Sequence, residues 1–216
     1  MTKLTKEQSD FIDIFLGGSP ERKEVFLKAK AQSEALIEDA EKAEATRTKA
    51  LVDLVASTGG EMIGLEYRLK SDESLTRKIF DRAEASGQPP EEVAKEMKDV
   101  LRYTTVFKPE AYVAGVQETV AKLLSSGHKK VKFKNTWGNA TGYLGINAVF
   151  ATPEGAMFEL QFHTADSFHA KDKGTHALYE EQRRLPVDSP RYAELEELQQ
   201  DVFDQVTRPE GAEKLK

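Results

Sequence analysis

Five polar side chains within residues 141–164 are of types that bind and activate substrates. The segment reads TGYLGINAVFATPEGAMFELQFHT; two runs alternate apolar and polar residues, and Thr-Pro-Glu-Gly between them predicts a β-hairpin. A three-residue loop closed by Gly155 pairs Asn147 with Gln161. One face is then apolar, and the other gathers Tyr143, Asn147, Glu159, Gln161 and His163. We interpret this polar face as one wall of an active site rather than as the solvent-exposed face of an ordinary hairpin.

A second cluster is basic and follows the spacing Arg68-x-Lys70-x-x-x-Ser74-x-x-x-Lys78, with Arg77 beside the last lysine. Arg68 and Lys70 share one face of a predicted strand, and Ser74 and Lys78 share one face of the following helix near its start. Cations, a hydroxyl and helix N-terminal amides that converge form a cradle for an oligophosphate. Exposed helical lysines and arginines are common, so this cluster alone is also compatible with a solvated surface.

Two further charged features are Asp99 and a lysine pair. Asp99 enters an otherwise apolar predicted strand, where it is either a site carboxylate or an ordinary turn residue. Lys132 and Lys134 lie on one face of a short strand, where lysines also serve to protect a sheet edge.

Composition limits the classes of function. The chain has 216 residues and a formal net charge of −6, which argues against a broadly basic nucleic-acid surface. It has no cysteine, which excludes disulfide scaffolds, thiolate metal sites and cysteine nucleophiles. No apolar run approaches the roughly 18 residues of a membrane span, and the first residues have no apolar signal region, so we expect no membrane partner.

The order of the predicted elements indicates an α+β fold with one mixed five-stranded sheet flanked by helices. The strands are expected at 61–70, 99–107 and 129–135 and in the hairpin. Helices are expected at 5–16, 21–57, 71–86, 90–97, 109–125, 165–184 and 190–207.

We divide the chain into an N-terminal helical extension (1–60), a domain that carries all of these polar clusters (61–207) and a frayed tail (208–216). The long helix at 21–57 has a thin, alanine-rich apolar face. It either packs on its own domain or mediates oligomerisation or attachment to a larger protein, and its sequence favours neither.

Together these clusters resemble the synthetase domain of the RelA/SpoT alarmone synthetase family, over residues 62–182. The family's R-x-K-x-x-x-S-x-x-x-K element matches Arg68 to Lys78, and its strand-opening Asp matches Asp99. Its lysine strand is similar to KFKN with Lys134, its G-Y-x-S-L-H to residues 142–147, and its E-I-Q-I-R-T to residues 159–164. A helix with a histidine resembles Ala170 to His176. The order of these motifs is more specific than any one of them.

The resemblance implies a nucleotidyltransferase-like pyrophosphokinase that moves pyrophosphate from ATP to the 3′-hydroxyl of a nucleotide. It implies that ATP is bound by Arg68, Lys70, Ser74, Arg77, Lys78 and Arg102. The catalytic carboxylates would be Asp99 and Glu159, which would share Mg²⁺. The acceptor would be bound by Lys134, Tyr143, Asn147, Gln161, His163 and His176, with Tyr143 stacking on its base.

The departures from the family pattern concern the nucleotide bases. Thr104 stands where the family has its adenine-stacking arginine; Arg102 lies two residues earlier, and we expect it on the opposite face of the strand. Asn147 and His163 replace the acceptor-side His and Arg, and the helical Glu is shifted to Asp172 or lost, with Lys171 nearby. The acceptor is therefore open between guanine nucleotides, adenine nucleotides and the 3′ end of tRNA.

The sequences FELQFHT and HALYEEQR resemble those of toxin-like members of the family. This resemblance predicts a growth-inhibiting enzyme, and its partner would be an immunity or antitoxin protein or a second copy of the chain. We expect it to act in the cytoplasm, its own or that of a target cell. No His-Asp pair occurs, so we expect no hydrolase half. The main alternative is an inactive nucleotide-binding or structural module of a larger protein. A different hydrolase or transferase on an unrelated fold also stays open.

Overall fold

The structure, a computed structural model, describes residues 19–139 and 142–216. The helix expected at 5–16 lies outside the described residues. The chain forms two compact units: residues up to Arg47 with Glu66–Leu101, and Thr48–Leu65 with Arg102–Lys216. The first part of the long helix shares its core with the helices that follow it, and the expected domain boundaries stay predictions.

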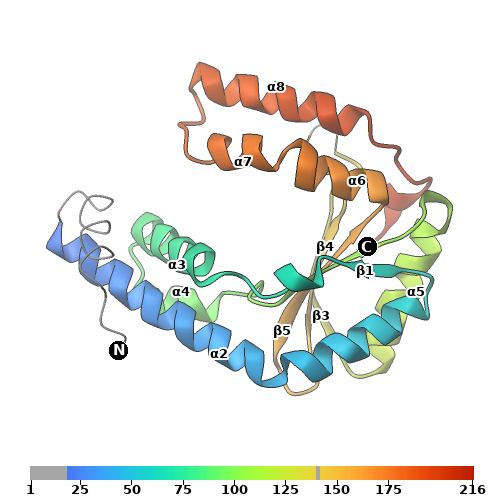
Figure 1. The fold of residues 1–216 in the computed structure, drawn as a ribbon, viewed down its shortest axis with the longest axis horizontal. Coiled ribbons are helices and arrows are strands. Elements are labelled where there is room, and N and C mark those ends of the chain that lie inside the picture. The colour runs from blue at the N-terminus through green and yellow to red at the C-terminus, as the bar shows by residue number, and fades with distance from the viewer. Residues whose placement is uncertain (1–18, 140–141) are drawn as a thin grey trace. The chain divides into compact units, whose positions relative to one another are not determined.

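The first unit is helical. It contains most of α2 (Pro20–Ala56), all of α3 (Asp72–Ser86) and the short α4 (Pro90–Lys95). Figure 1 shows α3 and α4 beside the N-terminal part of α2, where Val25, Phe26 and Leu36 pack against a buried core drawn from α3, α4 and the residues after them. This part of α2 therefore packs on its own chain, as one of the two readings of its sequence expected. Oligomerisation through its other faces stays a prediction.

The second unit contains a five-stranded sheet with the order β1-β2-β5-β4-β3. Its strands are β1 (Glu61–Ile63), β2 (Arg102–Val106), β3 (Lys129–Asn135), β4 (Ile146–Ala151) and β5 (Met157–His163). β2 and β5 are parallel, whereas the other neighbours are antiparallel. The predicted α+β class and mixed sheet are confirmed.

The β4–β5 hairpin has the register that its sequence predicts. Asn147 pairs with Gln161 and Phe150 with Phe158. Thr152 N donates to Ala156 O at 2.8 Å, and Gly155 has the left-handed φ of 92° that closes this loop. The apolar face is fully buried: Leu144, Ile146, Ala148, Phe150, Phe158, Leu160 and Phe162. This burial fixes which residues lie on the opposite, polar face.

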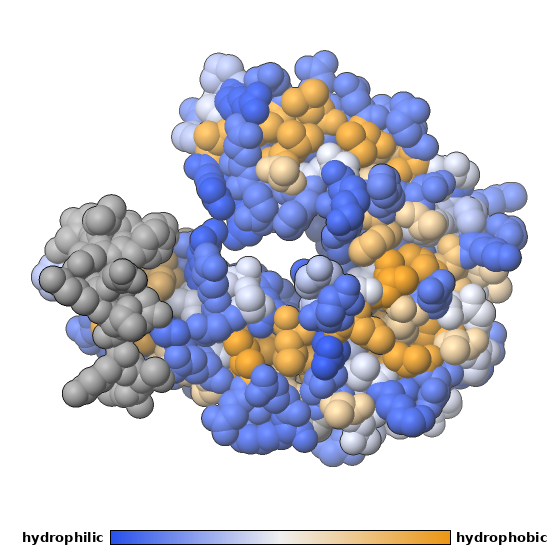
Figure 2. All heavy atoms as spheres, in the orientation of Figure 1, coloured by the Kyte–Doolittle hydropathy of each residue, from blue (hydrophilic) through white to orange (hydrophobic). Residues whose placement is uncertain are grey.

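The other helices of the second unit are α5 (Tyr112–Ser125), α6 (Ala165–His169), α7 (His176–Gln182) and α8 (Pro190–Asp204). The single helix expected at 165–184 is wrong, because a π-helical segment, η3 (Ala170–Gly174), separates α6 from α7. Figure 1 shows α7 and α8 side by side, and Figure 2 shows exposed hydrophobic residues along this pair. The exposed large side chains of this pair include Tyr179 of α7 and Leu198 of α8.

Three other expectations need correction. The strand expected at 61–70 ends at Ile63, because Gly64 takes a left-handed φ of 60° and a 3₁₀ turn, η1 (Leu65–Tyr67), follows. The strand expected at 99–107 begins at Arg102. The tail is not frayed: η4 (Ala212–Lys214) follows Gly211, and Asn135 Nδ2 donates to Ala212 O at 2.7 Å.

Another 3₁₀ turn, η2 (Pro109–Ala111), leads into α5. Within the described residues, no helix combines the length and the apolar character that a membrane span requires.

Candidate active site

Two lysines of the predicted phosphate cradle converge on Asp99 in the first unit. Lys70 Nζ and Lys78 Nζ donate to the same oxygen of Asp99, Oδ2, at 3.1 and 2.6 Å. The three side chains are mostly buried, with 17%, 25% and 15% of the side-chain surface exposed for Lys70, Lys78 and Asp99. The cradle thus carries two positive charges held around one negative charge.

Local structure brings these residues together. Leu69 and Leu101 form an antiparallel bridge, and Lys70 N donates to Val100 O at 2.9 Å, which places Lys70 beside the residue after Asp99. Ser71 then caps α3, as predicted, by accepting from Ser74 N at 3.2 Å. Lys78 follows Ser74 by four residues and therefore lies one turn further along the same side of α3.

The electrostatics of the cluster favour its ion-paired form. Burial alone would raise the pKa of Asp99, but the charges and hydrogen bonds of Lys70 and Lys78 outweigh it and hold that pKa at about 2. Burial lowers the pKa of Lys78, and the hydrogen bond that Lys78 donates to Asp99 opposes this effect. Because the lysines are already desolvated, they need little further loss of water to bind a phosphate oxygen.

The remaining residues of the predicted cradle have separate partners. Arg68 donates to both carboxylate oxygens of Glu44 on α2, through Nε and through Nη2. Arg77 pairs with Glu73 of its own helix at 3.2 Å, and Ser74 is exposed. The structure brings Lys70 and Lys78 together, whereas Arg68 and Arg77 are held by other carboxylates.

Arg102 lies in the second unit, on the same strand face as Thr104. β2 runs parallel to β5 with Arg102 opposite Glu159 and Thr104 opposite Gln161. The expectation that Arg102 faces away from Thr104 is wrong, because residues two apart on a strand share a face. Arg102 therefore belongs to the polar face that carries Glu159.

The polar face of the hairpin is organised around Glu159 and Gln161. Gln161 Nε2 donates to Glu159 Oε1 at 2.6 Å, and Gln161 Oε1 accepts from Lys171 Nζ at 2.6 Å. Thr104 Oγ1 donates to the same Gln161 oxygen at 3.5 Å. Gln161 is only 4% exposed, whereas Glu159 is partly exposed. Glu159 is thus held in place by a neighbour while part of it still faces solvent.

A second hydrogen-bonded group lies further along the same face. Tyr143 Oη donates to Asn147 Oδ1 at 2.6 Å and lies 2.8 Å from His163 Nε2. His163 Nδ1 lies 2.8 Å from Ser167 Oγ in the capping box that begins α6. Gly145 allows this packing, because a Cβ there would lie 2.8 Å from His163 Cε1.

This second group is neutral. Burial lowers the pKa of His163 well below its usual value, and the charge of Lys171 lowers it further. Burial, with the charge of Glu159, raises the pKa of Tyr143 well above its usual value. Both ring nitrogens of His163 are hydrogen-bonded and its side chain is fully buried, so in this structure His163 orients Tyr143.

Two predicted acceptor residues lie at the margins of this arrangement. Lys134 is exposed on β3 opposite Asn147, and His176 is exposed at the start of α7. Sequence reasoning missed the roles of Ser167 and Lys171. The Thr164-x-x-Ser167 spacing is a recognisable capping signal, whereas no periodicity marks Lys171, because a π-helical turn sets its direction.

Asp99 and Glu159 are the carboxylates predicted to bind Mg²⁺. Among residues 19–139 and 142–216, no group of three or more His, Asp or Glu forms an all-protein metal site. Mg²⁺ is usually bound by one or two carboxylates, with water and substrate phosphates as its other ligands. Asp99 and Glu159 lie in different units, so their sharing of one ion stays a prediction.

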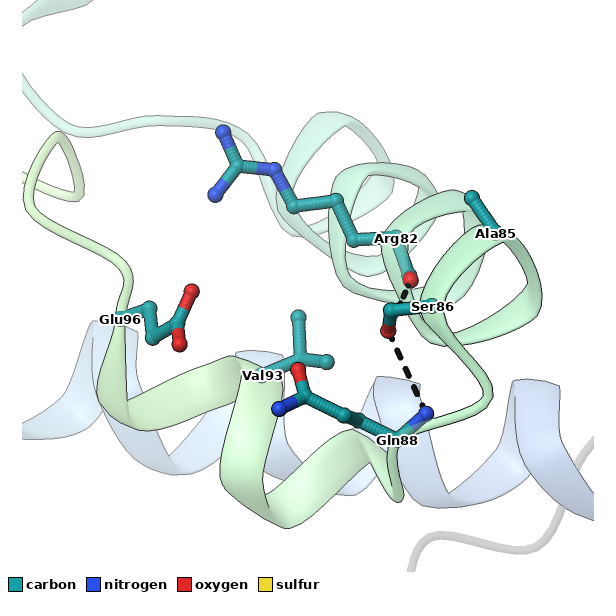
Figure 3. A pocket seen from close by; sticks show the side chains of 6 residues that line it. All are labelled: Arg82, Ala85, Ser86, Gln88, Val93 and Glu96. Atoms are coloured by element: carbon teal, nitrogen blue, oxygen red, sulfur yellow. Dashed lines mark hydrogen bonds between the residues drawn. The ribbon is translucent and has the colours of Figure 1, made fainter.

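The first unit also has a shallow pocket of about 260 Å³ between α3 and α4. Figure 3 shows Arg82 and Ser86 of α3 on one side and Val93 and Glu96 on the other. None of the predicted site residues lines it, and we assign it no function.

Known proteins resemble this chain in structure rather than in sequence. No family model matches the chain. No curated protein matches it. The Type VI effector Tas1, solved in complex with its immunity protein, matches with a TM-score of 0.55 and 21% identity over 79% of this chain and 94% of that one.

Small alarmone synthetase 1 from Bacillus subtilis, bound to its product pppGpp, matches with a TM-score of 0.52 and 15% identity over 78% of this chain and 88% of that one. The chain has the fold of the small alarmone synthetases. This alarmone-synthetase fold agrees with the resemblance found in the motifs.

Proposed function

We propose that this protein is a pyrophosphokinase that transfers the β,γ-diphosphate of ATP to a 3′-hydroxyl of a nucleotide or of tRNA. One observation carries the proposal: a chain with the alarmone-synthetase fold holds the partly exposed Glu159 on a polar hairpin face through a 2.6 Å hydrogen bond from Gln161. If the polar face of the hairpin only contacted solvent, nothing would require its carboxylate to be held in one orientation.

The first unit supplies the contacts to ATP. When ATP binds, Lys70 and Lys78 replace part of their contact with the Asp99 carboxylate by contacts with phosphate oxygens. Both ammonium groups therefore stay paired with a negative charge before and after ATP binds. Arg102, although it was predicted with this set, lies beside Glu159 in the second unit. We therefore assign Arg102 to charge stabilisation near the reacting groups, a role for which guanidinium groups are well suited.

The reaction is a displacement at the β-phosphorus. The acceptor's 3′-oxygen forms a bond to Pβ, the bond from Pβ to the α–β bridging oxygen breaks, and AMP leaves with that oxygen. Glu159 accepts the proton of the hydroxyl or orients it, a contribution worth roughly 10²–10⁴-fold. The lysines neutralise the charge that develops on the phosphates.

Asp99 and Glu159 are the residues that would hold Mg²⁺, and the ion would supply further neutralisation of phosphate charge. The acceptor base stacks on Tyr143, whose ring is fixed by Asn147 and His163. Lys134 is exposed on the neighbouring strand and is available to an acceptor phosphate.

We further propose that the protein is a toxin, neutralised by an immunity or antitoxin protein and active in the cytoplasm of a target cell or of its own cell. The matched effector Tas1 was solved in complex with its immunity protein, and this likeness supports the proposal. Growth inhibition on expression, relieved by a Glu159→Gln substitution, is the expected behaviour.

The acceptor is found by incubating the purified chain with Mg²⁺ and γ-labelled ATP together with one candidate acceptor at a time. Guanine nucleotides, adenine nucleotides and tRNA are the three candidates. The proposal predicts label on one of them with release of one AMP per transfer. Release of labelled phosphate or pyrophosphate alone would instead indicate a hydrolase.

A further inference from the structure

Lys171 is a half-buried lysine for which the proposed reaction has no role so far. It lies in the π-helical segment η3, between α6 and α7. Its ammonium group donates to Gln161 Oε1 at 2.6 Å and lies 5.7 Å from the centre of the Phe168 ring. π-Helical turns are rare and often occur at functional sites, where they redirect a side chain.

The contact determines which way the Gln161 amide points. A lysine ammonium only donates hydrogen bonds, so it can face the amide oxygen but not the amide nitrogen. With Oε1 bound to Lys171, Nε2 is the end that reaches Glu159 Oε1, at 2.6 Å. If the amide turned over, its oxygen would face the Glu159 carboxylate and its N–H groups would face the ammonium.

We propose that Lys171 is a positioning residue that, through Gln161, holds the Glu159 carboxylate in the orientation that receives the acceptor hydroxyl. This inference rests on the proposed function, because it explains how Glu159 is aimed. Lys171 itself touches neither nucleotide.

The charges around Lys171 make this arrangement sensitive to pH. Burial lowers the pKa of Lys171 to about 8, and Arg102 on β2 lowers it as well, whereas Glu159 on β5 and Asp172 beside it act in the opposite direction. Below pH 8 the group is an ammonium, which accepts no hydrogen bond. Above pH 8 it becomes an amine, which also accepts, so the ammonium no longer enforces the direction of the Gln161 amide and only the Glu159 carboxylate still does.

Lys171→Met removes the charge and keeps most of the volume of the side chain. We expect kcat to fall about 10- to 100-fold, the loss typical of a misplaced reacting group, with little change in the ATP dissociation constant. Lys171→Arg keeps a group that only donates, so it should recover most of the rate. It should also remove the fall in kcat that the wild type shows above about pH 8.

Lys173→Met is the matched control. Lys173 belongs to the same π-helical segment but is exposed and contacts Asp172 at 3.3 Å. Its removal should leave kcat and the pH profile unchanged. Equal kcat and equal pH profiles for Lys171→Met and the wild type would overturn the proposal, and so would a loss in Lys171→Met that Lys171→Arg does not restore.

A readout that needs no turnover separates this inference from the proposed function. NMR of the Gln161 side-chain amide should show its signals shifting with a midpoint near pH 8 in the wild type, and no such titration in Lys171→Met. If that titration is present but no acceptor receives label, the proposed function fails. If label is transferred but the Gln161 signals ignore Lys171, the positioning role fails.

Discussion

Lys70 and Lys78 share one oxygen of Asp99, and under the proposed function they would exchange part of this contact for phosphate oxygens. A carboxylate held by two ammonium groups keeps both lysines in place before a ligand arrives. It also competes with that ligand, so ATP must offer the lysines more than Asp99 does. A triphosphate with its metal ion meets this condition, because it carries several oxygens for the two cations.

Replacing Lys70 or Lys78 with alanine should therefore weaken ATP binding. A hydrogen bond to a charged group is worth about 1.5–3 kcal/mol, so the dissociation constant should rise about 10- to 150-fold. Calorimetry with ATP and Mg²⁺ measures this change. Lys95→Ala is the control, because Lys95 is an exposed lysine that pairs with Glu92. Unchanged affinity in both cradle variants would remove ATP from the first unit.

Asp99 should also make stability depend on acidity. Its pKa is lowered from 3.8 to about 2 on folding, so its stabilising contribution is complete above about pH 5 and is lost as the pH falls toward 2. The shift corresponds to at most about 2 kcal/mol of the free energy of unfolding. Urea unfolding between pH 5 and pH 2 should show a shallower loss in Asp99→Asn than in the wild type. Parallel curves would mean that the lysine pair does not stabilise the charged carboxylate.

At the scale of elements, the π-helical segment carries Lys171, which donates to Gln161 on the polar face of the hairpin. Gly174 ends this segment and lies against α8, where a Cβ would approach Val202 Cγ1 to 2.6 Å. The close approach fixes the distance between the segment and α8. It therefore also fixes the backbone position from which the Lys171 side chain extends to Gln161.

Gly174→Ala should destabilise the protein by about 1–3 kcal/mol, the usual cost of overpacking. The Gly174→Ala/Val202→Ala double variant should recover part of that loss, because the second change makes room for the new methyl group. Gly138→Ala is the control, since its Cβ would lie at an ordinary 3.6 Å from the nearest atom. Urea unfolding reads all three, and an unaffected midpoint in Gly174→Ala would show that α8 does not pack closely here.

Elements with a strong period could be predicted from the sequence, and elements with a local irregularity could not. The β4–β5 register follows from alternation and one left-handed glycine, and α2 follows from a run without glycine or proline. The π-helical turn inserts a residue without leaving any mark on composition. The predicted first strand continues past Gly64, where the structure ends it. The glycine alone does not mark a strand end, because glycines within strands also form bulges.

The site follows the same division. The motif order predicted that Lys70, Lys78 and Glu159 carry the chemistry, and the structure places the two lysines together on Asp99. Their roles stay predictions. His163 forms hydrogen bonds with Tyr143 and Ser167. These bonds depend on how α6 packs against the hairpin, and the spacing of residues in the sequence does not specify that packing.

For the whole molecule, the two clusters of candidate site residues lie in different units. The first holds the paired lysines with Asp99, and the second holds Glu159, Arg102, Gln161 and Tyr143. Structural likeness at 21% and 15% identity supports the fold of the small alarmone synthetases. It does not identify the acceptor, because the residues around Tyr143 differ from the family's pattern. The labelling assay with the three candidate acceptors identifies it.

Glu159→Gln tests the central claim most directly. The substitution keeps the shape of the side chain but removes its charge and basicity. With γ-labelled ATP, Mg²⁺ and the acceptor that the wild type labels, transfer should fall at least about 10²-fold, while the circular dichroism spectrum and the affinity for ATP without Mg²⁺ stay those of the wild type. Transfer by Glu159→Gln at the wild-type rate, or a wild type that binds ATP but labels no guanine nucleotide, adenine nucleotide or tRNA, would contradict the account.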